Sequence, residues 1–122
     1  MRALIIAAHG SRKKESNKEV VSLTEHVAKK TMGSFEKVEH AFLQFCDPLL
    51  ETKINELVKK GATDIVIFPF FIGSGNHILV DIPGLIKKAG LAHAHVKFKL
   101  TRHLGKLKAI EDVIIREVMA CQ

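Results

Sequence analysis

Two histidines stand just beyond short apolar segments and could bind a metal ion or move a proton. His9 follows the apolar residues 3–8, and His77 follows the apolar residues 65–72 and a turn rich in glycine. Neutral imidazole is the commonest nitrogen ligand for zinc, iron, cobalt and nickel, and imidazole also suits acid–base catalysis near neutral pH. Two imidazoles on adjacent loops would hold a divalent ion and leave coordination positions open. Open positions suit a metal that the protein hands over.

The segments before these histidines are typical of strands in a parallel sheet. The segments 3–8 and 64–71 are short, and apart from Asp64 they are apolar, which predicts strands buried on both faces. Ligands of open α/β sheets bind outside the carboxyl ends of the strands. We therefore expect the two strands to be neighbours and His9 and His77 to face one another across that edge.

Strand and helix patterns alternate along the whole chain. This alternation predicts one α/β domain over residues 1–122, with helices on both faces of a four-stranded parallel sheet. The expected strand order is 2-1-3-4, as in flavodoxin-like folds. The remaining strands are predicted at residues 37–45, at a sheet edge, and at residues 96–100.

Helix boundaries are predicted from capping signals. Ser16 and Glu19 form a capping box for a helix that runs to about residue 32, and Asp47 with Pro48 is typical of a second helix start. Pro83 is expected to break or restart the third helix, with Asp81 as its cap. The last helix is predicted at residues 105–121, with one apolar face made of Leu107, Ile110, Ile114 and Val118.

Composition narrows the class of protein. The 122 residues carry a net charge of +6, which favours an anionic partner, but the absence of Trp and Tyr argues against stacking on nucleic-acid bases. Cys46 and Cys121 are too far apart in sequence for a CxxC metal motif, and a disulfide framework is not expected, so a reducing cytosolic compartment fits best. The N-terminal apolar run is too short for a signal peptide or a membrane span.

Simpler interpretations exist for each motif. Either histidine alone is more often a buried, hydrogen-bonded residue or the neighbour of a helix cap. The turn at residues 73–75 lacks the spacing of nucleotide-binding loops, and phosphohistidine enzymes of the phosphoglycerate mutase type need Arg where this chain has Ala8. The other histidines are expected at the surface or at sheet edges: His26, His40, His93, His95 and His103.

Four segments carry a resemblance to a known family: LIIAAHGSR, AFLQFCDP, VIFPFFIGSGNHILVDIP and RHLGKLKAIEDVIIRE. Their specific parts are HGSR after the first strand and the G-x-x-x-H that precedes Asp-Ile-Pro. These segments resemble the class II tetrapyrrole chelatases in their short, single-half form, the sirohydrochlorin cobaltochelatase and ferrochelatase group. The resemblance covers nearly the whole chain in register.

The resemblance implies a chelatase-like fold and insertion of Co²⁺ or Fe²⁺, with Ni²⁺ as a further option, into sirohydrochlorin without ATP, for cobalamin or sirohaem biosynthesis. It implies no permanently bound cofactor. His9 and His77 would bind the metal, and His9 would also remove pyrrole protons. The residues expected to contact the macrocycle are Arg12, Gln44, Ile72, Gly73, Ser74, Gly75 and Asn76. A single half is expected to form a homodimer, without nucleic acid or membrane as a partner.

Gln44 departs from the pattern of several relatives, which carry Glu at this position. A neutral amide is a poor metal ligand and a poor proton acceptor, although it can form hydrogen bonds. The departure implies a weaker site with two histidine ligands. It also leaves open a second hypothesis, a protein that binds or carries metal or tetrapyrrole without catalysing insertion. A third hypothesis, a nucleic-acid-binding module, rests on net charge alone, and the sequence lacks the basic-aromatic pattern that such modules use.

Overall fold

Four parallel strands form one sheet in the order β2-β1-β3-β4, as the sequence predicts. The computed structural model describes residues 1–73 and 75–121, and within it the side chains of residues 76–79 are outside the described set. β2 lies at an edge, and β1 and β3 are central neighbours. The strands are β1 (Arg2–Ala8), β2 (Lys37–Phe42), β3 (Asp64–Phe70) and β4 (Lys97–Leu100).

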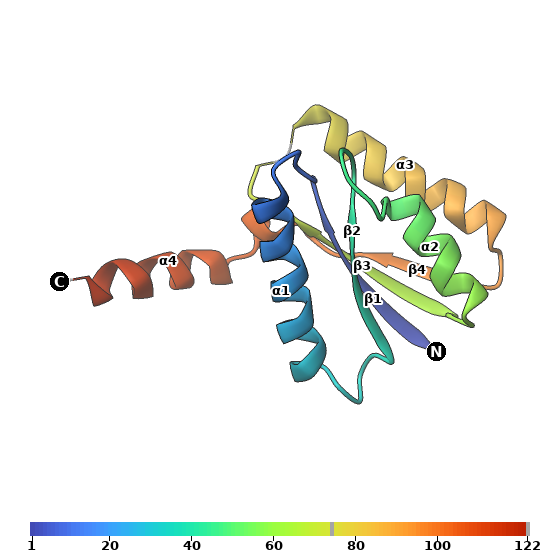
Figure 1. Ribbon diagram of the computed structural model, residues 1–122, viewed down its shortest axis with the longest axis horizontal. Helices are drawn as coiled ribbons and strands as arrows, with labels where there is room; N and C mark the ends of the chain where they lie inside the picture. Colours follow the sequence, from blue (N-terminus) through green and yellow to red (C-terminus); the bar gives the residue numbers. More distant parts are fainter. Residues whose placement is uncertain (74, 122) are drawn as a thin grey trace.

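Helices lie on both faces of this sheet. Figure 1 shows α1 on one side, α2 and α3 on the other, and α4 projecting away from the body. Among the helices in the described part of the chain, none has the length and apolar composition needed to cross a bilayer. The helical elements are α1 (Lys14–Lys30), α2 (Leu50–Lys59), α3 (Asn76–Ala92), the 3₁₀ turn η1 (Leu104–Lys106) and α4 (Ala109–Ala120).

The main core lies between the sheet and the α2–α3 layer. Ile54 and Leu57 of α2 pack there against Ile5, Ile65 and Ile67 of the central strands. β1 is buried on both faces from Ala3 onward, because helices or side chains cover each side. β3 is different from the prediction: alternate residues are buried, and the residues between them are only half-buried.

Two predicted helix starts are wrong. α1 begins at Lys14, and Ser16 lies inside it without a side-chain capping bond. The turn before α1 is instead held by Asn17, whose side chain accepts a hydrogen bond from the amide of Ser11 and donates one to its carbonyl. α2 begins at Leu50. The carbonyl of Pro48 accepts a hydrogen bond from the amide of Phe42 at 2.8 Å, and Leu49, which is extended, forms a parallel bridge with Phe42 at the end of β2.

The predicted break at Pro83 is also wrong, since α3 runs unbroken from Asn76 to Ala92. Pro83 lacks an amide donor, but it lies on the exposed side of the helix while Ile82 is buried and Leu85 packs against the core. Apolar packing on both sides of the proline outweighs the single missing hydrogen bond. The predicted last helix is divided into η1 and α4, and Ile114 is exposed rather than packed.

Candidate functional site

His9 lies just past the carboxyl end of β1 and is exposed. Its ring centroid is 5.0 Å from that of Phe71, the residue that follows β3, with the rings tilted by 48°. Within the described residues, no group forms a hydrogen bond to either ring nitrogen of His9. The aromatic contact therefore limits the motion of the imidazole, whose side chain is exposed.

Gly10 allows the chain to turn sharply after His9. Its φ is +89°, a left-handed conformation that glycine adopts at little cost, and a Cβ there would lie 1.9 Å from the carbonyl oxygen of Gln44. The backbone amide of Gln44 in turn donates a hydrogen bond to the backbone carbonyl of His9 at 3.1 Å. This close contact between backbones joins the loop after β1 to the loop after β2, and it places Gln44 beside His9.

Two cavities meet at His9. The first, which we call the Asp81 cavity, has a volume of about 690 Å³ and extends toward α3. This volume falls in the range of small-molecule sites, about 300–1,000 Å³. Its lining residues are His9, Leu43, Gln44, Gly75, Asp81, Ile82 and Leu85.

The second, the Leu104 cavity, has a volume of about 450 Å³ and lies toward α1. It includes the predicted macrocycle contacts Ile72 and Gly73, together with Phe71 and Leu104. Ile72 is 64% exposed, an unusual position for a large apolar side chain, and suits contact with a flat apolar ring. His9 is thus the residue shared by both hollows at this end of the sheet.

The predicted partner of His9 is placed only by its backbone. Residue 77 belongs to the first turn of α3, one turn before Asp81, and Gly75 precedes that helix at the rim of the Asp81 cavity. The side chains of His77 and Asn76, and Ser74 as a whole, lie outside the described residues. The convergence of the two imidazoles therefore stays a prediction.

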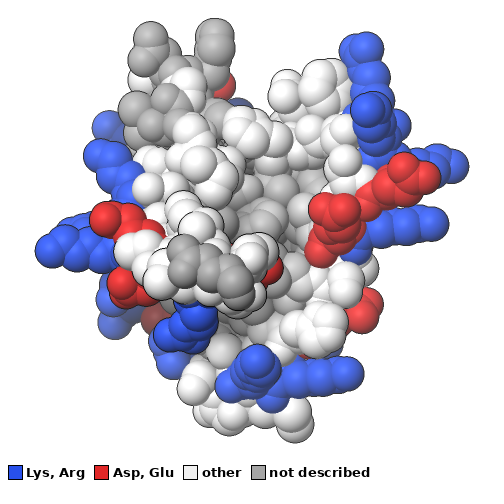
Figure 2. All heavy atoms as spheres, turned by 90° about the vertical axis from the view of Figure 1, so that its left-hand side faces the viewer, with Lys and Arg blue, Asp and Glu red and all other residues white. Residues whose placement is uncertain are grey.

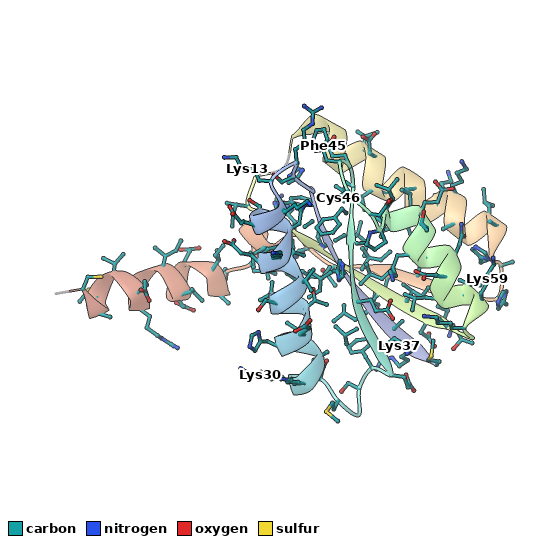
Figure 3. All side chains as sticks on the ribbon, viewed as in Figure 1. Lys13, Lys30, Lys37, Phe45, Cys46 and Lys59 are labelled. Carbon is teal, nitrogen blue, oxygen red and sulfur yellow. The ribbon has the colours of Figure 1, made fainter. Side chains whose placement is uncertain are left out.

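Lys and Arg do not form one stripe on the face that Figure 2 shows. They lie around the margin of that face, with Asp and Glu among them. Figure 3 places Lys13, Phe45 and Cys46 at one end of the molecule, and Lys30 and Lys37 at the other. The guanidinium of Arg12 lies 4.8 Å from the centroid of the Phe45 ring, so this predicted contact residue is exposed beside the loop that carries Gln44.

Some lining residues are not predicted from the sequence. Asp81 was expected to cap a helix, yet it lines the same cavity as His9. His103, expected at the surface or at a sheet edge, is half-buried, and its ring stacks on Phe71 with centroids 5.5 Å apart. The four-residue spacing between His77 and Asp81 is the signal that could have indicated Asp81, because such residues share one face of a helix.

Among the side chains that the structure describes, no three His, Cys, Asp or Glu residues gather closely enough to form a metal site. His9 and Asp81 line one cavity, and Gln44, the third polar side chain there, is neutral. The arrangement fits an exposed imidazole that meets a metal briefly, and it does not resemble a closed structural site with four ligands.

Comparison with known families identifies the fold. A family model described as CbiX matches residues 3–120. The chain belongs to the CbiX family. The resemblance to chelatases noted from the sequence is therefore confirmed at the level of the family.

Relatives in the CbiX family include named enzymes and solved structures. The chain is 30% identical over 118 residues to the chloroplastic sirohydrochlorin ferrochelatase of Arabidopsis thaliana, covering 97% of this chain and 52% of that protein. It is 34% identical over 86 residues to the sirohydrochlorin cobaltochelatase of Methanopyrus kandleri, covering 70% of this chain and 59% of that protein. This chain thus spans only about half to three-fifths of the length of these two relatives.

The solved structures of the family show the same fold. The sirohydrochlorin chelatase SirB from Bacillus subtilis subspecies spizizenii in complex with cobalt superposes with a TM-score of 0.81 at 25% identity, over 98% of this chain and 50% of that chain. The cobalamin biosynthesis CbiX protein from Marinobacter aquaeolei VT8 superposes with a TM-score of 0.74 at 27% identity, over 98% of this chain and 99% of that chain.

Proposed function

We propose that this chain is a sirohydrochlorin chelatase, which inserts Co²⁺ or Fe²⁺ into the tetrapyrrole without ATP. The observation that carries the proposal is the position of His9, exposed at the meeting point of two cavities at the carboxyl edge of the sheet. Membership of the CbiX family and the names of the relatives support the same activity. The metal is a substrate in this reaction, and the product would enter cobalamin or sirohaem biosynthesis.

The reaction exchanges one divalent ion for two protons of the ring. Two pyrrole N–H bonds break, two metal–nitrogen bonds replace them, the other two ring nitrogens also bind the metal, and two protons leave. His9 would deliver the ion from one ring nitrogen and accept a proton as the ion enters the macrocycle, since imidazole can do both near neutral pH. His77 would supply the second ligand from the first turn of α3, and Asp81 would carry protons away from the cavity.

The macrocycle would lie across the opening with its charged arms outward. Ile72, Gly73 and Gly75 border the cavities and would contact the flat ring, as would Ser74 and Asn76 of the same turn. Arg12 and Gln44 would contact polar groups at the ring edge. Sirohydrochlorin carries eight carboxylates according to the family resemblance, so the net charge of +6 favours its approach.

We further propose that two copies act together and that the protein works in the cytoplasm. The chain matches 50% of the SirB chain, which leaves room in that relative for a second unit of this size. The two cysteines of this chain, Cys46 and Cys121, are free, which agrees with a reducing compartment.

The test is the rate of metal insertion, followed by absorption spectroscopy of sirohydrochlorin mixed with Co²⁺ or Fe²⁺. We expect His9→Ala to lower the rate at least about a hundred-fold, the effect of removing a positioned acid–base group. His95→Ala is the matched control, because His95 is exposed and precedes the amino end of β4, whereas His9 follows the carboxyl end of β1. A His9→Ala variant with the wild-type rate would reject the mechanism.

A binding or carrier function is the second candidate, and the neutral Gln44 favours it. A carrier would bind one equivalent of tetrapyrrole or metal and give no insertion above the spontaneous rate. Isothermal titration beside the absorption assay separates the two functions. Gln44→Glu would add a carboxylate beside His9 in the Asp81 cavity and should tighten Co²⁺ binding under either function.

A further inference from the structure

A third cavity, which we call the Arg102 cavity, opens where the carboxyl ends of β3 and β4 meet α3. Its volume is about 220 Å³. Among the described residues that line it, none is Asp or Glu, and three are basic. It therefore combines an apolar wall with a cluster of positive or proton-donating groups. The apolar wall includes Phe71, Ile82 and Leu100, and the basic residues are Arg102, His103 and Lys106.

Two of these basic side chains have no counter-ion within the described part of the chain. The ion pairs formed there belong to Lys53, and neither Arg102 nor Lys106 takes part in one. The side chains of Arg102 and Lys106 are also absent from the side-chain hydrogen bonds among the described residues. Two like charges that line one small cavity repel each other. An anion bound between them would relieve this repulsion.

The loop that carries the basic residues is held firmly against β3. The amide of Thr101 donates a hydrogen bond to the carbonyl of Ile67 at 3.0 Å, and the amide of Gly105 donates one to the carbonyl of Phe71 at 3.2 Å. A Cβ at Gly105 would collide with the carbonyl of Ile72, so only glycine allows the backbones to approach this closely. The basic side chains thus extend from a backbone that is fixed at both ends of the loop.

The size of the Arg102 cavity limits what it can hold. Sites for whole small molecules measure about 300–1,000 Å³, so this one suits a side arm of a larger ligand. Ile82 and Leu100 would pack on a short apolar stem, and Arg102 and Lys106 would bind a carboxylate at its end. His103 is half-buried beside them and can donate a further hydrogen bond even when its imidazole is neutral.

The Arg102 cavity shares a wall with each of the two cavities that meet at His9. Phe71 lines both this cavity and the Leu104 cavity, and Ile82 lines both this cavity and the Asp81 cavity. The ring of Phe71 also contacts two imidazoles, with its centroid 5.0 Å from that of His9 and 5.5 Å from that of His103. A flat ring seated at His9 would therefore have its edge close to the Arg102 cavity.

We propose that the Arg102 cavity binds one carboxylate arm of the tetrapyrrole, with Arg102 and Lys106 holding the carboxylate. This inference rests on the proposed function and adds a specificity determinant to it. Anchoring one arm fixes which edge of the ring faces His9. A tetrapyrrole with an apolar group in place of that arm would leave both cations without a partner and would bind more weakly.

The test is the dissociation constant for metal-free sirohydrochlorin, measured from the change in its own absorption on binding. We expect Arg102→Gln/Lys106→Gln to raise this constant about ten-fold, the usual effect of losing a hydrogen bond to a charged group. Lys59→Gln/Lys60→Gln is the matched control, because it removes the same two positive charges from exposed positions at the C-terminal end of α2. The control should bind as wild type does.

Salt and turnover separate a carboxylate contact from a structural role. The difference between Arg102→Gln/Lys106→Gln and wild type should shrink as salt is added, because both side chains are exposed to solvent at the cavity. In the insertion assay, KM should rise with kcat unchanged, since the arm is held equally before and during metal insertion. A difference that salt does not alter, or a loss in kcat alone, would overturn the inference.

Binding and insertion fail in different ways. Sirohydrochlorin that binds Arg102→Gln/Lys106→Gln as tightly as wild type would overturn this inference alone, and the cavity would then serve a separate small anion or none. An equal loss in the Lys59→Gln/Lys60→Gln control would overturn it as well, because net charge would explain the effect. A wild-type protein that does not bind sirohydrochlorin would reject the chelatase proposal together with this inference.

Discussion

His9 owes its position to backbone contacts of Gly10 and Gln44 and to the ring of Phe71. Gly10 lets the loop turn with a positive φ, and the bond from the Gln44 amide to the His9 carbonyl holds that turn against the next loop. Phe71 contacts the imidazole from β3. The site residue is thus fixed by backbone geometry on one side and by an aromatic ring on the other, while its side chain remains exposed.

Gly10→Ala should therefore damage both stability and activity. The new Cβ would meet a backbone carbonyl, which cannot move aside like the end of a flexible side chain. We expect a loss of at least about 2 kcal/mol in the free energy of unfolding, measured by urea denaturation, and a slower insertion rate. Gly33→Ala is the control, because Gly33 also has a positive φ, +92°, but no atom lies near its Cβ position. Equal losses in both variants would show that the close contact has no effect.

The edge strand β2 is joined to α2 by an ion pair. Lys53 of α2 lies 2.7 Å from Glu39 of β2 and 2.9 Å from Glu56 of its own helix. Burial opposes the charge of Lys53, but hydrogen bonds to the two carboxylates outweigh it and raise the pKa of its ammonium group. Partial burial, followed by the nearby positive charge of Lys53, lowers the pKa of His40 on the same strand below its ordinary 6.5.

This lowered pKa predicts how stability depends on pH. The unfolded chain binds the His40 proton more tightly than the folded one, so the contribution is fully present above about pH 6.5 and is lost as the pH falls below it. His40→Gln should make the free energy of unfolding fall less between pH 7.5 and 5.5 than in wild type. Urea denaturation at both values measures this. An unchanged or steeper fall in the variant would contradict the assignment.

At the scale of the whole molecule, the net charge is +6, and Lys and Arg lie at several separate places on the face that Figure 2 shows. Figure 3 places Lys13 at the end of the molecule that holds the site and Lys59 elsewhere, and Lys14 follows Lys13 as the first residue of α1. If the macrocycle approaches as a polyanion, the lysines nearest the site should matter most, because salt screens charges beyond about 10 Å at 0.1 M.

We therefore expect Lys13→Glu/Lys14→Glu to raise the KM for sirohydrochlorin several-fold at low salt, and the difference from wild type to shrink as salt is added. Lys59→Glu/Lys60→Glu changes the net charge equally and is the control, with a much smaller effect. Steady-state insertion rates across a salt series provide the measurement. Equal effects of the two variants would mean that only net charge, and not its placement, affects binding.

The order of strands, the parallel sheet and the position of His9 beyond β1 were predictable from the sequence, because apolar runs and their spacing reflect local burial. The helix starts near Ser16 and Asp47 were predicted wrongly. There, Asn17 and the Pro48 carbonyl form contacts with the chain several residues away, and these outweigh the local capping signals.

Only the tertiary structure could show that Gln44, Asp81 and His9 share one cavity. His9 lies in the loop after β1, Gln44 in the loop after β2 and Asp81 in α3, and the sheet brings these three elements together. It also revealed that α4 does not cover its own sheet. The apolar pattern of Ile114 and Val118 determined that this helix must be buried against something, because water solvates such side chains poorly. Which surface buries it is a property of three-dimensional packing, and a one-dimensional pattern carries no record of the partner.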